Sequence, residues 1–510
     1  MIPEFRYDNK ETQMIGIGYV LYGVYIISTF WLFLTVLAQL HLLWHSRKER
    51  GKRLQSSADV LPSVSIQVPV YNEKYVIEGL LQSLTELNYP QHLFEIQVLD
   101  DSTDETAGII DEQVAIIKQR GFAISVLRRE IREGYKAGAL QQGLPECKGE
   151  LIAIFDADFR PQTDFLRSLI PHFKDSTVGL VQARWGHLNQ EQNFLTRIQT
   201  YLLDMHFTVE QEGRFNAGHY VNFCGTAGIW RKQCIVESGG WDGSILSEDL
   251  DLSYRAQLKG WRLIYDKDVV VPAQLPVSVE AFKVQQFRWS KGMAQIAKKT
   301  MHHVWQAQVP LKKKLHGTFH LLGSVTFVCL YINALLTVPL LQLRHIYPQF
   351  ITLTNYTAVG AVNLAALAYL YYTSAESGPK KNFQFLLNYP LFVIVYLALS
   401  VQNAVAVIQG FAGLRSPFVR TPKIDISAPQ NSYRQKNIGW IARLEVGLLV
   451  YFMYGIGLSF YYEDFFLLFF FVLMCSGLVI LLYPVVKPRL AGSLVLHKQL
   501  YQQLKKAFLF

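Results

Sequence analysis

The stretch Leu151-Ile152-Ala153-Ile154-Phe155-Asp156-Ala157-Asp158 decides the fold. Its first five residues are apolar, which predicts a short buried strand, and two carboxylates follow closely. In an extended chain, a spacing of two residues puts Asp156 and Asp158 on the same side. Such a pair can hold a hard divalent cation, because Mg²⁺ binds one or two carboxylates and shares its other positions with water and phosphate oxygens.

The residues upstream alternate between strand and helix patterns. Strands are predicted at Val64–Val70, Phe94–Leu99 and Phe122–Leu127, and helices at Tyr75–Leu87, Glu105–Gln119 and Lys136–Leu144. This alternation predicts βαβ units and a mostly parallel sheet. Ligands bind such a sheet beyond the carboxyl ends of its strands, so a functional site is expected there.

Three further acidic or polar clusters lie at the ends of predicted elements, and the first, Tyr71-Asn72-Glu73, follows the first strand. Asp100-Asp101 follows the second strand, and Ser247-Glu248-Asp249 opens a predicted helix. Either of the latter two clusters alone would be read as a turn or a helix cap, but carboxylates crowded into one site repel one another and need a cation. No phosphate-binding glycine motif is present in the sequence. A bound phosphate therefore has to be held by a metal ion and by basic side chains, with Lys136 and Arg288 as candidates.

Long apolar runs flank this predicted α/β domain. Hydrophobic residues make up 50% of the 510-residue chain, and charged residues only 17%. A helix needs roughly 20 apolar residues to cross a bilayer, so most of the runs without Asp, Glu, Lys or Arg are long enough to do so. These runs are 12–46, 315–343, 345–375, 382–414, 446–462 and 465–486.

The basic residues indicate how the chain lies in the membrane. The cluster at residues 47–53 follows the first run, which predicts an outside N-terminus and a cytoplasmic α/β domain. The net charge of +9 would also suit nucleic acid. The bases gather at the ends of apolar runs, however, so we expect lipid headgroups as their partners and no nucleic acid. The five scattered cysteines include no C-x-x-C pair and predict neither disulfides nor a zinc site.

The stretch Gln285-Gln286-Phe287-Arg288-Trp289 lies just before the chain becomes predominantly apolar. If residues 281–299 form a helix, Gln285, Arg288 and Trp289 share one face at spacings of three and four residues. Such an amphipathic helix can lie at the membrane surface beneath the soluble domain. Membrane anchoring alone, with Trp at headgroup depth and Arg on lipid phosphates, is the simpler explanation of this motif by itself.

Four motifs occur in order: Asp100-Asp101, Asp156-x-Asp158, Ser247-Glu248-Asp249 and Gln285-x-x-Arg288-Trp289. Together they resemble the signature of processive family-2 glycosyltransferases, which include cellulose, chitin and hyaluronan synthases. They look most like the mannan, glucomannan and glucan branch of the cellulose-synthase-like enzymes. The resemblance implies a GT-A fold: a Rossmann-like α/β nucleotide-sugar domain in the cytosol, inserted between α-helical transmembrane segments. It also implies an inverting enzyme that polymerises hexose from UDP-glucose or GDP-mannose into a β-linked polysaccharide, with β-1,4 linkage expected, and moves it across the membrane.

The resemblance also assigns roles to residues of this chain. Asp249 is the general base, with Glu248 beside it in the catalytic pair, and Asp156 and Asp158 hold Mg²⁺ or Mn²⁺. The nucleotide-sugar donor is bound by Asp100, Asp101, Lys136, Asp156, Gln285 and Arg288. The growing polysaccharide acceptor is bound by Trp289, Phe223, Cys224 and Gly225.

Residues 417–423 resemble the F-x-V-T-x-K gating loop of cellulose synthases, with Arg420 in place of valine. By this resemblance, Thr421 and Lys423 join the donor site. A loop that reaches the active site must be cytoplasmic, so an even number of crossings separates it from the α/β domain. Three apolar runs intervene, and we expect run 382–414 to lie at the interface, because Pro390 and several polar residues interrupt it. Five spanning helices and a cytoplasmic C-terminus follow.

The predicted domain order runs along the whole chain. It comprises a transmembrane helix (1–46), the cytosolic GT-A domain (47–280), amphipathic interface helices (281–314), two transmembrane helices (315–375), an interfacial helix with the gating loop (382–438), two transmembrane helices (439–486) and a basic cytosolic tail (487–510). We expect a multi-pass protein of a plasma, inner or Golgi-type membrane.

The sequence leaves several alternatives open. One is a non-processive membrane glycosyltransferase that acts on a lipid, similar to ceramide glucosyltransferase. Another is a transporter or receptor with a non-catalytic cytosolic domain. Accessory subunits and an oligomer also stay open.

Overall fold

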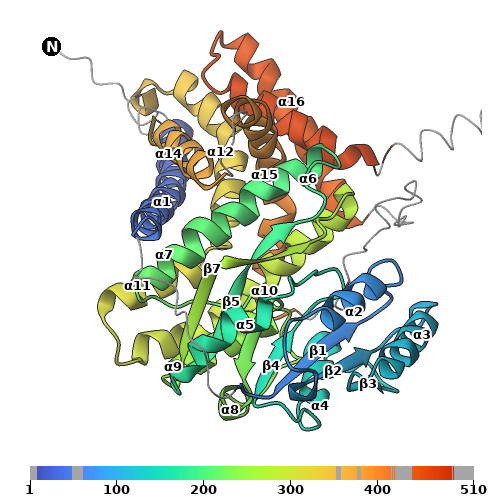
Figure 1. Ribbon diagram of the computed structural model, residues 1–510. Helices are drawn as coiled ribbons and strands as arrows, with labels where there is room; N and C mark the ends of the chain where they lie inside the picture. Colours follow the sequence, from blue (N-terminus) through green and yellow to red (C-terminus); the bar gives the residue numbers. More distant parts are fainter. Residues whose placement is uncertain are drawn as a thin grey trace, which may run out of the picture.

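The computed structural model describes residues 9–48, 61–351, 358–375, 381–414 and 439–484, together with 416, 419 and 486. Figure 1 shows an α/β domain at one end of the molecule and a group of apolar helices at the other. Helix α10 (Val279–Gln306) lies between the two parts.

Within the described residues, seven strands form one sheet in the order β3-β2-β1-β4-β6-β5-β7. Their bounds are β1 Val64–Val70, β2 Phe94–Asp100, β3 Ile124–Arg128, β4 Leu151–Ile154, β5 Val178–His187, β6 Gly228–Arg231 and β7 Arg262–Ala273. Only β6 runs antiparallel to its neighbours, β4 and β5. The other neighbouring strands pair in parallel, which confirms the predicted mostly parallel sheet.

Helices cover both faces of the sheet. One face packs against α2 (Ile77–Thr85), α3 (Thr106–Gln119) and α5 (Phe165–Leu169), and the other against α4 (Tyr135–Gly143), α8 (Lys232–Glu237) and α9 (Glu248–Leu258). Strand β4 shows why its sequence is continuously apolar. Leu151 and Ala153 enter the first core, whereas Ile152 and Ile154 enter the second, as expected for a strand that is buried on both faces.

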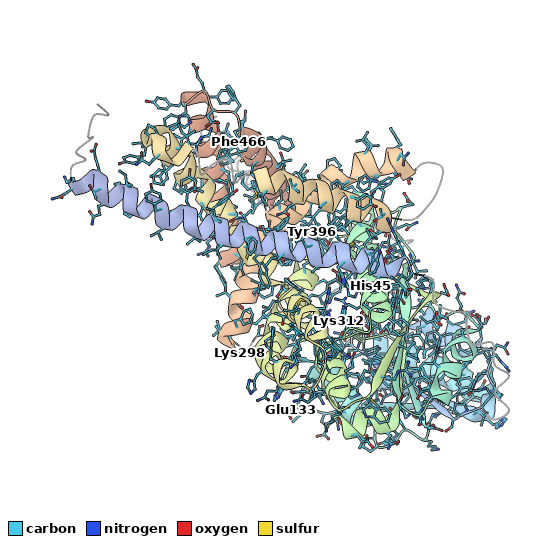
Figure 2. All side chains as sticks on the ribbon, turned by 90° about the vertical axis from the view of Figure 1, so that its left-hand side faces the viewer. His45, Glu133, Lys298, Lys312, Tyr396 and Phe466 are labelled. Carbon is cyan, nitrogen blue, oxygen red and sulfur yellow. The ribbon has the colours of Figure 1, made fainter. Side chains whose placement is uncertain are left out.

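A helical connection between β5 and β6 joins the α/β domain to the apolar helices. It consists of α6 (Phe194–Asp204), the π-helix η3 (Met205–Gln211) and α7 (Glu212–Asn216). The long helix α1 (Asn9–Ser46) packs against η3 and α7. Figure 2 shows α1 running past the apolar helices and ending, near His45, beside the α/β domain.

Four of the described helices are long and apolar enough to cross a membrane. By length and composition these are α1, α12 (Val325–Ile346), most of α15 (Lys381–Ala412) and α16 (Trp440–Tyr461). Runs 345–375 and 465–486 give shorter helices, α14 (Ala358–Ser374) and residues 468–484. Association with a membrane is therefore supported. Helix α15, which we expect at the interface, also meets the length criterion, and the domain boundaries and the number of crossings stay predictions.

The residues that follow α15 begin beside α10. The Lys291 ammonium donates to Gln409 Oε1 at 3.0 Å and to Ser416 Oγ at 2.8 Å. We therefore expect Ser416→Cys to react with a membrane-impermeant maleimide only from the side that labels Lys118→Cys in the α/β domain. Tyr461→Cys, at the end of α16, should react only from the opposite side. Labelling of position 416 from the side that reaches Tyr461→Cys contradicts the predicted topology.

Candidate active site

A cleft opens beyond the carboxyl ends of β1 and β4 and is bounded on one side by helix α10. Most of the predicted site residues line it: Asp101, Lys136, Asp156, Asp158, Cys224, Gly225, Glu248, Asp249, Gln285, Arg288 and Trp289. They come from segments nearly 190 residues apart in the sequence. The carboxylates after β4, the acids of α9 and the arginine of α10 therefore converge on one space.

Lys136 connects the acids after β4 to the segment 223–225. The Asp156 backbone N–H donates to the Thr226 hydroxyl at 2.9 Å, which fixes the start of the acidic turn. The Lys136 ammonium pairs with Asp156 Oδ1 and donates to the Gly225 carbonyl at 2.9 Å. Burial lowers the pKa of Lys136, but Asp156, Glu248 and Asp249 outweigh burial and raise it. Lys136 is therefore a permanent cation in the cleft.

Glu248 and Asp249 open helix α9 inside the cleft. The Leu250 N–H donates to Asp249 Oδ1 at 2.8 Å. Gly225 approaches the other oxygen so closely that a Cβ at 225 would lie 3.1 Å from Asp249 Oδ2, and its φ of +86° also favours glycine. Burial raises the pKa of both carboxyls, and the charge of Asp249 raises that of Glu248 further, whereas Lys136 and Arg288 act in the opposite direction. A carboxylate with a raised pKa in a cleft suits general-base chemistry.

Helix α10 presents Gln285, Arg288 and Trp289 to the cleft from one face, as the spacing predicts. Burial lowers the pKa of Arg288, and the nearby Glu248 and Asp156 offset only part of this shift, but a guanidinium stays charged at neutral pH. One turn further along the helix, a Cβ at Gly292 would overlap the Ser247 side chain. The helix therefore lies directly against the residue that precedes Glu248 and Asp249.

Four predicted residues are not seen at the cleft. Asp100 is 2% exposed and accepts hydrogen bonds from Arg128 Nε at 2.8 Å and from the Ser102 N–H at 2.9 Å. Phe223 is fully buried, and its side chain lies in the core that packs against α4, α8 and α9. Thr421 and Lys423 lie outside the described residues. The proposed roles of these four residues stay predictions.

Tyr71 and Arg132 line the cleft, although no role was predicted for either from the sequence. The Arg132 guanidinium lies 3.5 Å from the centroid of the Tyr71 ring, and the pair flanks Asp101, whose carboxylate accepts hydrogen bonds from Arg129 Nε at 2.9 Å and Nη2 at 2.5 Å. The arginine-rich stretch after the third predicted strand was an available signal, because parallel strands end at one edge of the sheet.

Trp185 and His187, near the end of β5, also line the cleft. The His187 side chain lies 3.0 Å from Asp204 Oδ1 through its Nε2. No strand was predicted at the position of β5, so these residues were not expected at the carboxyl end of the sheet.

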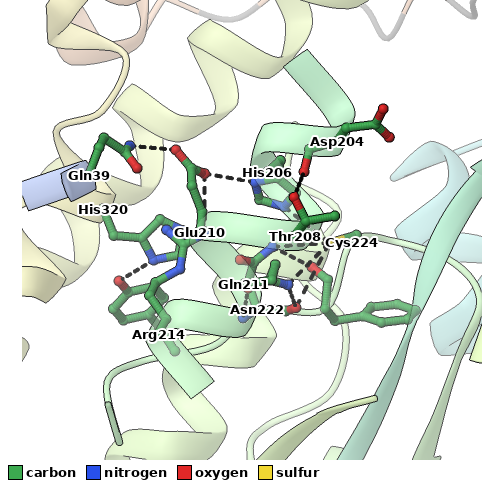
Figure 3. A network of polar contacts seen from close by, with 12 residues as sticks. Gln39, Asp204, His206, Thr208, Glu210, Gln211, Arg214, Asn222, Cys224 and His320 are labelled. Atoms are coloured by element: carbon green, nitrogen blue, oxygen red, sulfur yellow. Dashed lines mark hydrogen bonds and ion pairs between the residues drawn. The ribbon is translucent and has the colours of Figure 1, made fainter. Parts of the chain in front are cut away.

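A polar network ties the segment 223–225 to helix α1 (Figure 3). Cys224 Sγ lies 3.6 Å from His206 Nε2, and His206 Nδ1 lies 2.9 Å from Glu210 Oε2. Gln39 of α1 donates to the other Glu210 oxygen at 2.5 Å. Burial and the Asp249 charge raise the pKa of the Cys224 thiol, so this cysteine is an unreactive part of the wall. The network makes helix α1, a candidate membrane span, part of the support of the cleft.

Comparison with known proteins identifies similar sequences among glycosyltransferases. Residues 65–235 match Glycosyl transferase family 2. The chain is 41% identical over 318 residues to glucomannan 4-beta-mannosyltransferase 1 of Oryza sativa subsp. japonica, covering 58% of this chain and 60% of the relative. The protein of the same name from Cyamopsis tetragonoloba is 40% identical over 315 residues with the same coverage. The match thus spans about 60% of the length of these curated relatives.

A solved structure, the mannosyltransferase PcManGT from Pyrobaculum calidifontis in complex with GDP-Man and Mn²⁺, aligns with a TM-score of 0.48 and 19% identity. The alignment covers 78% of this chain and 100% of that one. Residues 151–406, half of this chain, match Glycosyl transferase family group 2. The α/β domain has the expected GT-A class, and apolar helices flank it. The chain belongs to the family-2 group of glycosyltransferases.

Proposed function

We propose that the protein is an inverting, processive glycosyltransferase that extends a β-linked polysaccharide, with β-1,4 linkage expected, from a nucleoside-diphosphate hexose. One observation carries the proposal: the acids after β4, the acids of α9 and Arg288 and Trp289 of α10 share a cleft. Because the curated relatives are named mannosyltransferases, a mannose donor such as GDP-mannose is favoured, with UDP-glucose as the second candidate. The neighbouring apolar helices would carry the product across the membrane.

The reaction is a single displacement at the anomeric carbon of the donor sugar. The acceptor hydroxyl attacks this carbon, Asp249 takes the hydroxyl proton, and the bond to the diphosphate breaks on the opposite face. The leaving diphosphate gains negative charge, which Arg288 and Lys136 stabilise within a partly buried site. Asp249 suits the role of base because its raised pKa makes it a stronger proton acceptor than an ordinary aspartate.

The cleft has the donor set for a divalent metal ion. Six carboxylates line it, against three basic side chains, Arg132, Lys136 and Arg288. This excess of negative charge fits a bound cation, and carboxylate oxygens suit Mg²⁺ or Mn²⁺. Asp156 and Asp158 would hold the ion, which would neutralise charge on the diphosphate.

Trp289 offers a flat apolar face to the pyranose ring of the acceptor. Truncation in Trp289→Ala should raise the KM for a soluble oligosaccharide acceptor by up to about tenfold, the scale of about 1.4 kcal/mol expected for a ring contact. The KM for the sugar nucleotide should change much less. Trp305→Ala, an exposed tryptophan at the end of α10, is the matched control. Equal changes in the two KM values contradict a stacking role for Trp289.

The acid pair predicts a pH dependence of turnover. The base acts only when it is deprotonated, and its pKa is raised. As the pH is lowered, activity should therefore be lost at a higher pH than the value of about 4 at which an ordinary carboxyl group titrates. Replacement in Glu248→Gln removes a neighbouring negative charge, which should lower the pKa of Asp249 and move the acid limb of kcat/KM to lower pH. A limb that stays in place, or moves to higher pH, contradicts the coupling of the two carboxyls.

The proposed donor and product are tested with the full chain purified in detergent. A panel of sugar nucleotides is assayed for release of nucleoside diphosphate, and the radiolabelled product of the active donor is then extracted with organic solvent. We expect GDP-mannose or UDP-glucose to be turned over and the label to remain in insoluble polymer. Label in the organic phase supports the lipid-acceptor alternative, and no diphosphate release with any donor contradicts a catalytic role.

A further inference from the structure

Three histidines from distant segments meet where α1 reaches the α/β domain. They are His41 in α1, His219 just after α7, and His316 in helix α11 (Leu311–Leu321). One ring nitrogen from each lies within 4.8 Å of the others. The ring centroids of His219 and His316 are 4.1 Å apart, and those of His41 and His316 are 4.7 Å apart. Figure 2 labels the neighbouring His45 and Lys312 at this junction.

The burial of His219 requires an explanation. His219 is only 4% exposed, and neither of its ring nitrogens has a hydrogen-bond partner among the described residues. Buried polar side chains nearly always have such a partner, and a bound water or ion is a usual reason for an exception. The imidazole rings of His316 and His41 lie beside it, with their centroids 4.1 Å and 6.2 Å from that of His219.

The surroundings keep the cluster ready for a metal ion. Burial lowers the pKa of His219 to about 3, and the neighbouring His316, His41, His45 and Lys312 act in the same direction. The ring is therefore neutral at pH 7, the form in which imidazole binds transition metals. Lys312 and Arg214 add positive charge that opposes a cation, but Arg214 is within 3.4 Å of the Glu210 carboxylate, which offsets part of this effect.

We infer that His41, His219 and His316 form a binding site for a transition-metal ion, with Zn²⁺ as the best match. Three imidazole nitrogens and a water molecule make a common zinc coordination set, with Zn–N distances of about 2.0–2.1 Å. The stacked rings have to turn toward one ion, since tetrahedral geometry brings the nitrogens to about 3.4 Å from one another. The exposed position of His41 leaves room for the water.

This site differs from the acidic cleft in position and chemistry. Oxygen donors such as Asp156 and Asp158 suit hard cations, whereas imidazole suits Zn²⁺ and its neighbours. The cysteine pattern predicts no zinc site, but the histidine donors come from positions too far apart for any sequence motif. A bound ion would fasten α1 and α11 to the segment that leads into Phe223, Cys224 and Gly225.

Metal binding by the full chain in detergent tests the site without any turnover, so the result is independent of the proposed reaction. The protein is stripped with chelator and titrated with Zn²⁺ in excess Mg²⁺, which occupies the oxygen-donor site. Co²⁺ is then substituted for Zn²⁺, because the visible spectrum reports tetrahedral coordination by nitrogen. The variants are His41→Ala and His316→Ala, with His302→Ala, an exposed position on α10, as the control.

We expect one Zn²⁺ per chain in the wild type and in His302→Ala, and a rise in Tm when the ion binds. The apparent Kd should increase at least about tenfold in His41→Ala and in His316→Ala, since even outer contacts of a metal site have effects of this size. His41 is exposed on its helix, so its replacement should leave folding intact. Absence of Zn²⁺ binding in the wild type, or an unchanged Kd in His41→Ala, overturns the inference.

Discussion

Replacement in Asp249→Asn should reduce release of nucleoside diphosphate by about 10²–10⁴-fold, the contribution expected of a positioned general base. The amide keeps the shape of the side chain and can still accept from the Leu250 N–H, which now lies 2.8 Å from Asp249 Oδ1. It cannot take a proton from the acceptor hydroxyl. The loss should appear in kcat at saturating donor, because the proposed donor contacts of Lys136 and Arg288 are left unchanged by this substitution.

The control for this experiment is Asp268→Asn, an exposed carboxylate in strand β7 outside the cleft. It should retain full turnover and the same Tm as the wild type. Comparison with Glu248→Gln separates the two acids of the pair. If Glu248→Gln loses as much activity as Asp249→Asn at every pH, Asp249 is not the sole base and the assignment has to be changed.

Replacement in Asp158→Ala should abolish metal-dependent turnover, with a loss of about a thousandfold or more. A metal ion contributes several kcal/mol to the stabilisation of developing charge on phosphate. The Asp158 residue is only 5% exposed and lies in the cleft beside Asp156, so its loss removes one of the two acids proposed to hold the ion. Diphosphate release is measured across a series of Mg²⁺ and Mn²⁺ concentrations, where the variant should show no activation by either ion.

Asp164→Ala, an exposed acid six residues further along the chain, is the matched control and should keep the metal dependence of the wild type. Thermal unfolding of both variants shows whether a loss of turnover reflects a loss of fold. Full activity of a folded Asp158→Ala variant, with unchanged metal dependence, contradicts the role of the acid pair.

Most of the elements that were predicted correctly have a local periodic pattern of apolar and polar residues. The strand that ends before Asp156 and the helix that carries Arg288 and Trp289 were both predicted, because each is encoded in a short, regular pattern. Asp100 and Asp101 were both predicted to bind the donor, whereas the structure places them in different surroundings. Successive side chains of a strand point to opposite sides, so Asp100 turns toward Arg128 at 2.8 Å and only Asp101 reaches the cleft.

The residues that were missed depend on contacts between distant segments. Strand β6 enters the sheet antiparallel between β4 and β5, so the place of Trp185 and His187 follows from pairings that no local pattern specifies. The histidine cluster joins positions 41, 219 and 316, and only the packing of α1 and α11 on the α/β domain brings them together. Tyr71 and Arg132 had a usable signal, because both follow predicted strands.

Helix α10 belongs to both halves of the molecule. A Cβ at Gly410 of α15 would lie 2.6 Å from the Lys291 carbonyl oxygen, and Lys283 pairs with the buried Glu445 of α16 at 2.7 Å. Chimeric enzymes that exchange catalytic domains between relatives should therefore take this helix as one uncut piece, together with its partners on α15 and α16. A splice inside it that adds or removes one residue would turn either Arg288 or the contacts with α15 and α16 by about 100°, and the hybrid would be inactive even with every catalytic residue present.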